Sequence, residues 1–137
     1  MSRARWLSMI VATLLVSLTA CDHASTMSPA LVATGRYTMT AVRGRGPATG
    51  TLTLSATGDA ERRVRYQLNT GTLSSEYVAR GTFQPQPDGT VDLQLREDNG
   101  RSAYVWRPFA EWHDGVLSIS YPDAADGPAI VETYQRE

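Results

Sequence analysis

The feature of this sequence that most constrains its fold is a two-residue alternation of apolar and polar side chains from Gly35 onward. Segment 91–96 shows it most clearly. Successive residues of a strand point to opposite faces, so this period predicts half-buried strands. No stretch keeps the 3.6-residue period of a helix over three turns. Turn residues separate eight expected strands, at residues 36–42, 51–55, 62–68, 77–83, 91–96, 102–107, 116–121 and 129–135.

The connections between these strands are short and rich in Gly, Pro and Asp, as at 87–89, 98–100 and 126–128. Short connections pair consecutive strands as antiparallel hairpins. Eight such strands close most simply into a barrel, which removes exposed sheet edges. We therefore expect an all-β fold, an eight-stranded antiparallel up-and-down barrel. Segment 109–112 is expected to form one helical turn or a long loop.

The alternation also assigns residues to faces. In the first expected strand, one face carries Tyr37, Met39 and Ala41. In the third, the residues expected to point inward are Val64, Tyr66 and Leu68.

Composition excludes several kinds of site. All 13 basic residues are Arg, so neither a P-loop lysine nor a Schiff-base lysine is present. One Cys cannot form an internal disulfide, and one Cys with two His cannot supply a closed zinc site from soft ligands alone. The net charge of −1 argues against broad nucleic-acid binding, which needs a basic surface.

The N-terminus has the features of an export signal. Arg3 and Arg5 precede an apolar run at 6–18, which is shorter than the roughly 20 residues of a membrane span. The sequence Leu18-Thr19-Ala20-Cys21 then resembles the lipobox of bacterial lipoproteins. That resemblance implies cleavage between Ala20 and Cys21 and lipid attachment to the Cys21 sulfur. The alternative is a plain signal peptide, or a short anchor, with an incidental Cys.

These features divide the chain into a signal peptide at 1–20, a lipidated flexible tether at 21–34 and a barrel domain at 35–137. Loss of residues 1–20 removes two Arg and no acid, which takes the net charge from −1 to −3. The lipobox implies a bacterial cell-envelope protein anchored in a membrane and facing the periplasm. Asp22 resembles the signal that retains lipoproteins in the inner membrane of enteric bacteria.

The barrel itself resembles the lipocalin-like (calycin) barrels. Those open with Gly-x-Trp and carry a late Arg that packs over the Trp. Here Gly35-Arg36-Tyr37 stands at the first strand and Arg136 follows the last. The resemblance implies that Arg136 stacks on Tyr37 to close the barrel, and that the interior holds a small apolar ligand.

Aromatic side chains are the candidates for lining a ligand pocket. Packing of the barrel core is the simpler interpretation, because aromatic residues are favoured in strands and mostly buried. Tyr104 and Trp106 share one face and Ala103 and Val105 the other, so one of these pairs must point outward. The candidate ligand-binding residues are Tyr37, Tyr66, Tyr77, Tyr104, Trp106 and Tyr121.

Three polar clusters remain. His113, with Glu111 and Asp114, would serve as an acid–base pair or in a metal site, although a hairpin turn explains the same residues. The run of Arg62, Arg63 and Arg65 suggests a solvated strand face, or else an anion or lipid head-group patch. Loop 43–46 is a mobile loop or gates the barrel mouth. No catalytic motif is present, and we expect no catalytic residue, no metal and no cofactor.

We therefore expect a monomeric, non-enzymatic, lipid-anchored binding module whose partners are the membrane and a small apolar ligand. The alternative is an envelope interaction or inhibitor protein with a filled barrel, which binds partners through its loops.

Overall fold

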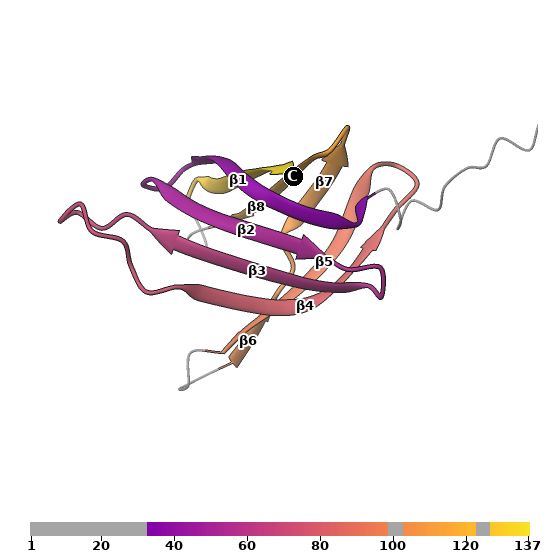
Figure 1. The fold of residues 1–137 in the computed structure, drawn as a ribbon, viewed down its shortest axis with the longest axis horizontal. Coiled ribbons are helices and arrows are strands. Elements are labelled where there is room, and N and C mark those ends of the chain that lie inside the picture. Colours follow the sequence, from indigo (N-terminus) through magenta and orange to yellow (C-terminus); the bar gives the residue numbers. More distant parts are fainter. Residues whose placement is uncertain (1–32, 99–102, 123–126) are drawn as a thin grey trace, which may run out of the picture.

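The computed structural model describes residues 33–98, 103–122 and 127–137. Strands joined by turns and loops make up almost all of these residues (Figure 1). The strands are β1 (Gly35–Arg43), β2 (Ala48–Leu54), β3 (Asp59–Tyr66), β4 (Tyr77–Pro85), β5 (Thr90–Asp98), β6 (Ala103–Trp106), β7 (Phe109–His113), β8 (Val116–Pro122) and β9 (Ala129–Arg136).

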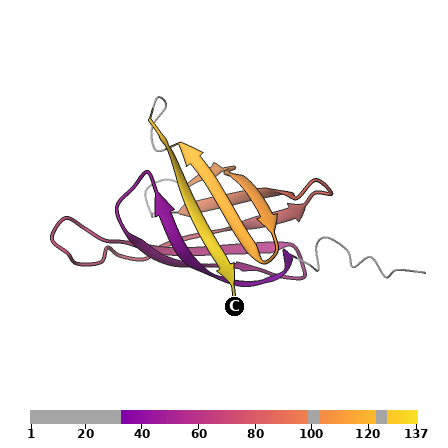
Figure 2. The same ribbon diagram turned by 90° about the horizontal axis from the view of Figure 1, so that it is seen from above.

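The strands form a closed antiparallel barrel in up-and-down order, as the sequence predicts. Consecutive strands pair with each other except β6 and β7, which both pair with β5. β9 pairs back to β1, which closes the barrel. Figure 1 shows β1 to β4 side by side, and Figure 2 shows β8 and β9 crossing above the opposite wall. The barrel has eight strand positions because β6 and β7 occupy one of them.

The sixth position is broken at Arg107-Pro108. One part of β5 pairs with β7, from Thr90 to Asp92, and the rest pairs with β6, from Leu95 to Asp98. Proline has no N–H to donate, so the ladder stops there. Beyond Pro108 the chain resumes as β7, so the expected helical turn or long loop at 109–112 was wrong.

Two face assignments also fail. A β-bulge between Met39 and Ala41 shifts the β1–β9 register, so Ala41 is exposed although Tyr37 is buried. Leu68 is 48 % exposed because β3 ends at Tyr66 and the chain then enters the β3–β4 connection. This connection extends beyond the barrel in Figures 1 and 2.

Gly81 marks a close approach of β4 and β5. A Cβ atom at this position would lie 1.8 Å from the carbonyl oxygen of Gln94. Only glycine permits this backbone contact, which helps the sheet to curve where β4 meets β5.

The interior is divided into two halves. We call the end of the barrel where β1 begins the sealed end, and the end where β1 finishes the open end. The sealed half of the interior, next to the sealed end, is filled by buried apolar side chains, among them Tyr37, Leu52, Leu54, Phe83, Val91 and Leu117. Outside this end lies a hollow of about 370 Å³ between segment 85–91 and Trp112.

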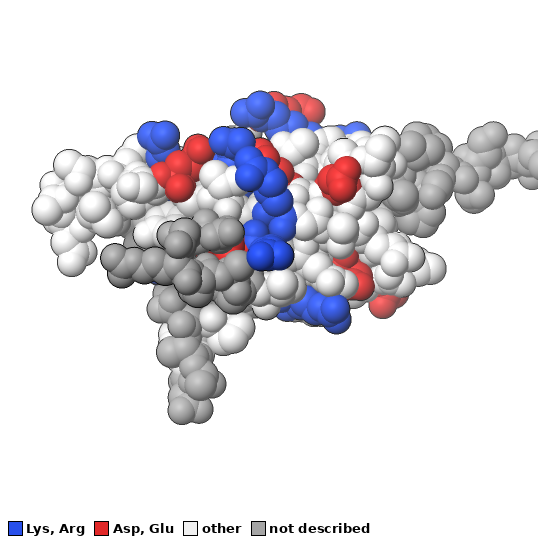
Figure 3. Space-filling view, turned by 90° about the horizontal axis from the view of Figure 1, so that it is seen from below, with Lys and Arg blue, Asp and Glu red and all other residues white. Residues whose placement is uncertain are grey.

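The outer face carries interspersed charges. Figure 3 shows a band of basic side chains with acidic side chains beside it. Arg63 pairs with Glu61 at 2.6 Å and with Glu76 at 3.0 Å, and Arg80 pairs with Glu61 at 2.7 Å. For Arg63 and Arg65 the solvated-face interpretation therefore holds, whereas Arg62 points into the barrel.

Within the described ranges, no helix has the length and apolarity needed to cross a lipid bilayer.

Candidate functional site

The open half of the barrel contains a cavity of about 520 Å³. This volume lies within the usual range of small-molecule sites. Its wall is built from both sides of the barrel and from the break in the sixth strand position. The lining residues are Arg45, Arg62, Tyr66, Tyr77, Glu97, Trp106, Arg107, Pro108, Tyr121 and Pro122.

Two pairs of aromatic rings form the walls. The ring centroids of Tyr66 and Tyr77 are 5.5 Å apart, and those of Trp106 and Tyr121 are 5.0 Å apart with their ring planes at 65°. Such separations and tilts are favourable for aromatic contacts. Val105 is 61 % exposed and points outward from β6. Its neighbour Trp106 points inward and lines the cavity.

The Arg45 guanidinium lies at the mouth of the cavity. Its carbon is 4.2 Å from the centroid of the Tyr66 ring, a cation–π distance. Arg45 follows Gly44, which has a φ of 81°. A Cβ at Gly44 would lie 2.6 Å from the carbonyl oxygen of Ala129, so glycine is needed for the turn that carries Arg45.

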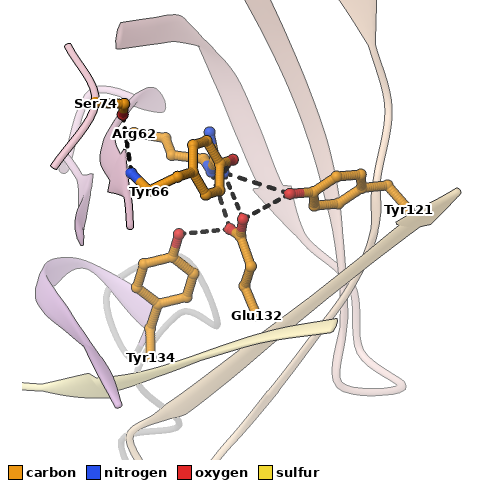
Figure 4. Close-up of polar contacts among 6 residues, drawn as sticks. All are labelled: Arg62, Tyr66, Ser74, Tyr121, Glu132 and Tyr134. Atoms are coloured by element: carbon orange, nitrogen blue, oxygen red, sulfur yellow. Dashed lines mark hydrogen bonds and ion pairs between the residues drawn. The ribbon is translucent and has the colours of Figure 1, made fainter. Parts of the chain in front are cut away.

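An ion pair between Arg62 of β3 and Glu132 of β9 lies at the floor of the cavity (Figure 4). The two side chains are 3 % and 0 % exposed. Arg62 Nε donates to Glu132 Oε2 at 2.9 Å, and Arg62 Nη2 donates to Oε1. Tyr121 and Tyr134 donate to the same carboxylate at 2.6 and 2.7 Å. Two groups on opposite walls are thus joined across the barrel.

These contacts keep both charges. Burial by itself raises the pKa of Glu132, but the hydrogen bonds and charge of Arg62 and the two tyrosine hydroxyls outweigh it, so the pKa is lowered. Burial likewise opposes the charge of Arg62, and Glu132 more than compensates, which raises the Arg62 pKa. Burial and the adjacent carboxylate raise the pKa of both Tyr121 and Tyr134. The floor is therefore ionic with neutral tyrosines around it.

One donor in this region is buried without an acceptor. Trp106 Nε1 has no hydrogen-bond partner among the described residues. A buried donor without a partner is costly, and in native proteins it usually signals a water or a ligand.

The structure brings together four of the six candidate ligand-binding residues: Tyr66, Tyr77, Trp106 and Tyr121 all line the cavity. Tyr37 lies at the sealed end, where its hydroxyl donates to the carbonyl oxygen of Ala33 and accepts from Trp112 Nε1 at 3.0 Å. The side chain of Tyr104 lies outside the described residues.

Tyr37 of β1 and Arg136 of β9 lie opposite each other in the strand pairing that closes the barrel. The Arg136 side chain passes beside Gly35, at which a Cβ would lie 2.9 Å from Arg136 Nε. Burial raises the pKa of Tyr37, with opposing effects from the Trp112 hydrogen bond and from the Arg136 charge. Stacking of Arg136 on Tyr37 stays a prediction. The lipobox Leu18-Thr19-Ala20-Cys21 and Asp22 lie outside the described residues.

Sequence reasoning missed Arg62 and Glu132. A signal was available in each strand. Arg62 lies two residues from Val64, so both point to the inward face of β3. Glu132 lies two residues from Ile130 and from Tyr134, so all three share the buried face of β9. A charge with core parity on two strands is unusual, because isolated charges are rarely buried. That combination could have indicated an internal ion pair.

His113 belongs to a hairpin turn between β7 and β8. Asp114 and Gly115 have φ values of 48° and 79°, as a tight turn of this kind requires. His113 Nε2 lies 3.1 Å from an Asp114 oxygen, and both side chains are almost fully exposed. Among the described residues no three His, Cys, Asp or Glu side chains are grouped to hold a metal ion.

The open half thus offers aromatic walls, fixed donors and positive charge around a space of small-molecule size. This combination suits reversible binding of an amphipathic molecule. The chain matches no protein-family model and no curated protein sequence.

Proposed function

We propose that this protein is a binding module that holds one small molecule in the open half of its barrel. The observation that carries the proposal is the cavity of about 520 Å³, walled by the Tyr66–Tyr77 and Trp106–Tyr121 pairs. Small barrels are able to enclose a single small ligand. The proposed role is carriage or sensing of that ligand without chemical change.

Native mass spectrometry of the full-length protein purified from its host tests this proposal. We expect a co-purifying mass that is lost in Trp106→Ala, which removes an indole from the wall. Val105→Ala is the matched control, since Val105 is the outward neighbour on the same strand. Repeated absence of any bound mass from the unaltered protein would contradict the proposal.

We further propose that the protein acts in the bacterial cell envelope, anchored through lipid on Cys21 and facing the periplasm. The support is the order of basic residues, apolar run and lipobox. Ala33, the first described residue, packs at the sealed end, and the cavity opens at the other end of β1. The anchored barrel would therefore present its mouth away from the membrane.

Metabolic labelling with radioactive palmitate tests the anchor. We expect label in the unaltered protein and none in Cys21→Ala, which should also leave the membrane fraction. If Cys21→Ala still appeared in the membrane fraction as the unaltered protein does, the proposed lipid anchor would be overturned. That result would leave the cavity proposal intact.

A second candidate function is binding of a protein partner through the loops. The observation in its favour is the β3–β4 connection, which projects from the barrel and exposes Leu68 and Leu73 (Figure 1). A pull-down from envelope extract with Leu68→Ser/Leu73→Ser as the comparison tests it. We expect any specific partner to be lost in that variant, and retention would contradict the loop-binding role.

A further inference from the structure

Several hydrogen-bond donors at the floor of the cavity have no acceptor among the described residues. Both oxygens of Glu132 are fully used, each by one Arg62 nitrogen and one tyrosine hydroxyl. All the hydrogen bonds of Arg62 to described residues leave from Nε and Nη2, so its Nη1 hydrogens remain.

Two neighbours add further donors. The hydroxyl of Tyr66 accepts from Arg62 Nη2 at 2.9 Å, and no described residue accepts its own proton. Trp106 Nε1 is the buried donor without a partner. The guanidinium carbon of Arg62 lies 5.4 Å from the centroid of the Trp106 ring, so these groups are neighbours.

Among the described residues that line the cavity or pair with its lining, the charge is positive by one. The charged residues on the lining are Arg45, Arg62, Arg107 and Glu97. Glu132 is the ion-pair partner of Arg62. Three cations against two carboxylates favour a ligand with one negative charge. A phosphate monoester carries nearly two charges at neutral pH and would exceed this balance.

We propose that the ligand is a small carboxylic acid with an apolar, planar body. Its carboxylate is held at the floor by donors from Arg62, Tyr66 and Trp106, and its body lies between the two aromatic pairs. This inference rests on the proposed function and narrows it, because the sequence alone suggested only an apolar ligand. A carboxylate is an acceptor-only group, which matches the donors at the floor that have no acceptor among the described residues.

The geometry also explains why the floor can hold an anion despite Glu132. The Glu132 carboxylate holds one edge of the Arg62 guanidinium. The hydroxyls of Tyr121 and Tyr134 in turn hold that carboxylate in place. The other edge of the guanidinium is therefore already oriented. Preorganised donors bind an anion without the cost of rearrangement. Arg45, held over the Tyr66 ring at the mouth, adds a second positive charge on the entry path.

Isothermal titration of the full-length protein with three matched probes tests the inference. The probes are 2-naphthoate, its neutral analogue 2-naphthamide, and 2-naphthyl phosphate. We expect 2-naphthoate to bind about tenfold tighter than the amide, as hydrogen bonds to a charged group imply. Equal binding of acid and amide, or tighter binding of the phosphate, would overturn the carboxylate assignment and leave the binding function standing. Absence of binding by all three would contradict the proposed function itself.

A matched pair of variants locates the carboxylate. Tyr66→Phe removes the hydroxyl beside Arg62, and Tyr77→Phe removes that of its ring partner while both keep the aromatic wall. We expect Tyr66→Phe to lower the acid-to-amide affinity ratio by roughly threefold or more, and Tyr77→Phe to leave the ratio unchanged. A purely structural role of Tyr66 would weaken both probes equally and so keep the ratio, which would contradict the inference.

Discussion

The two halves of the barrel interior contain the same residue types but differ in whether their polar groups have partners. In the sealed half, the indole N–H of Trp112 donates to the Tyr37 hydroxyl at 3.0 Å, and Tyr37 donates in turn to a backbone carbonyl. In the open half, the indole N–H of Trp106 is buried without an acceptor among the described residues. A core satisfies its own polar groups, whereas a binding site leaves some of them for its ligand.

The Arg62–Glu132 pair lies between these halves and belongs to both. Its carboxylate is saturated by groups of the barrel itself, and its guanidinium forms part of the cavity floor. Such a pair is not a strong source of net stability, because desolvation offsets most of the attraction. It orients a charged donor on the cavity lining.

The largest effect is expected from removal of one partner of this pair. Glu132→Gln leaves the Arg62 charge buried and unpaired, and we expect a loss of about 3–5 kcal/mol in the free energy of unfolding. Urea denaturation measures it. Arg62→Met/Glu132→Leu, which removes both charges, should lose less than Glu132→Gln alone, and a greater loss in the double variant would contradict this account.

Truncation in each half should separate stability from binding. Leu117→Ala in the sealed half should cost about 2–5 kcal/mol, because Leu117 is fully buried. Its affinity for 2-naphthoate should stay unchanged wherever the variant is folded. Trp106→Ala should abolish binding of the same probe. Comparable losses of affinity in the two variants would show that the halves are not distinct sites.

Acid should weaken the boundary between the halves. The pKa of Glu132 is lower in the folded state, so its contribution is present above its ordinary value of 4.5 and is lost as the pH falls below it. We expect the urea midpoint to fall with decreasing pH below about 4.5, and Glu132→Gln to flatten that slope. Glu61→Gln is the control, since Glu61 has a lowered pKa at the surface through Arg63 and Arg80; an equal flattening there would contradict the assignment.

The smallest effect is expected on the outer wall, which belongs to neither half. Arg80 pairs with Glu61 at 2.7 Å, but its side chain is 66 % exposed. Arg80→Ala should change the free energy of unfolding by less than about 1 kcal/mol, because solvent screens such pairs. A larger loss would mean that the outer ion pairs, and not the interior, hold the barrel together.

The strands and their order were predictable because both depend on local signals. Alternation marked the strands, and turn residues forced consecutive pairing. The bulge near Thr40 and the resumption of the chain as β7 after Pro108 were not predictable, since both depend on how neighbouring strands meet. Four cavity residues were found from their aromatic character. The Arg62–Glu132 pair was missed because its members are 70 positions apart in the sequence and only barrel closure brings them together.

The most direct test of the central claim follows the two indole N–H groups by NMR. In a 1H–15N spectrum of the full-length protein, the signals of Trp106 and Trp112 are assigned with Trp106→Phe and Trp112→Phe. We predict that 2-naphthoate shifts the Trp106 indole signal, because the carboxylate accepts its hydrogen bond, and leaves the Trp112 signal in place. A shift of the Trp112 signal alone, or no shift of either at saturation, would contradict the claim that the open half is the binding site.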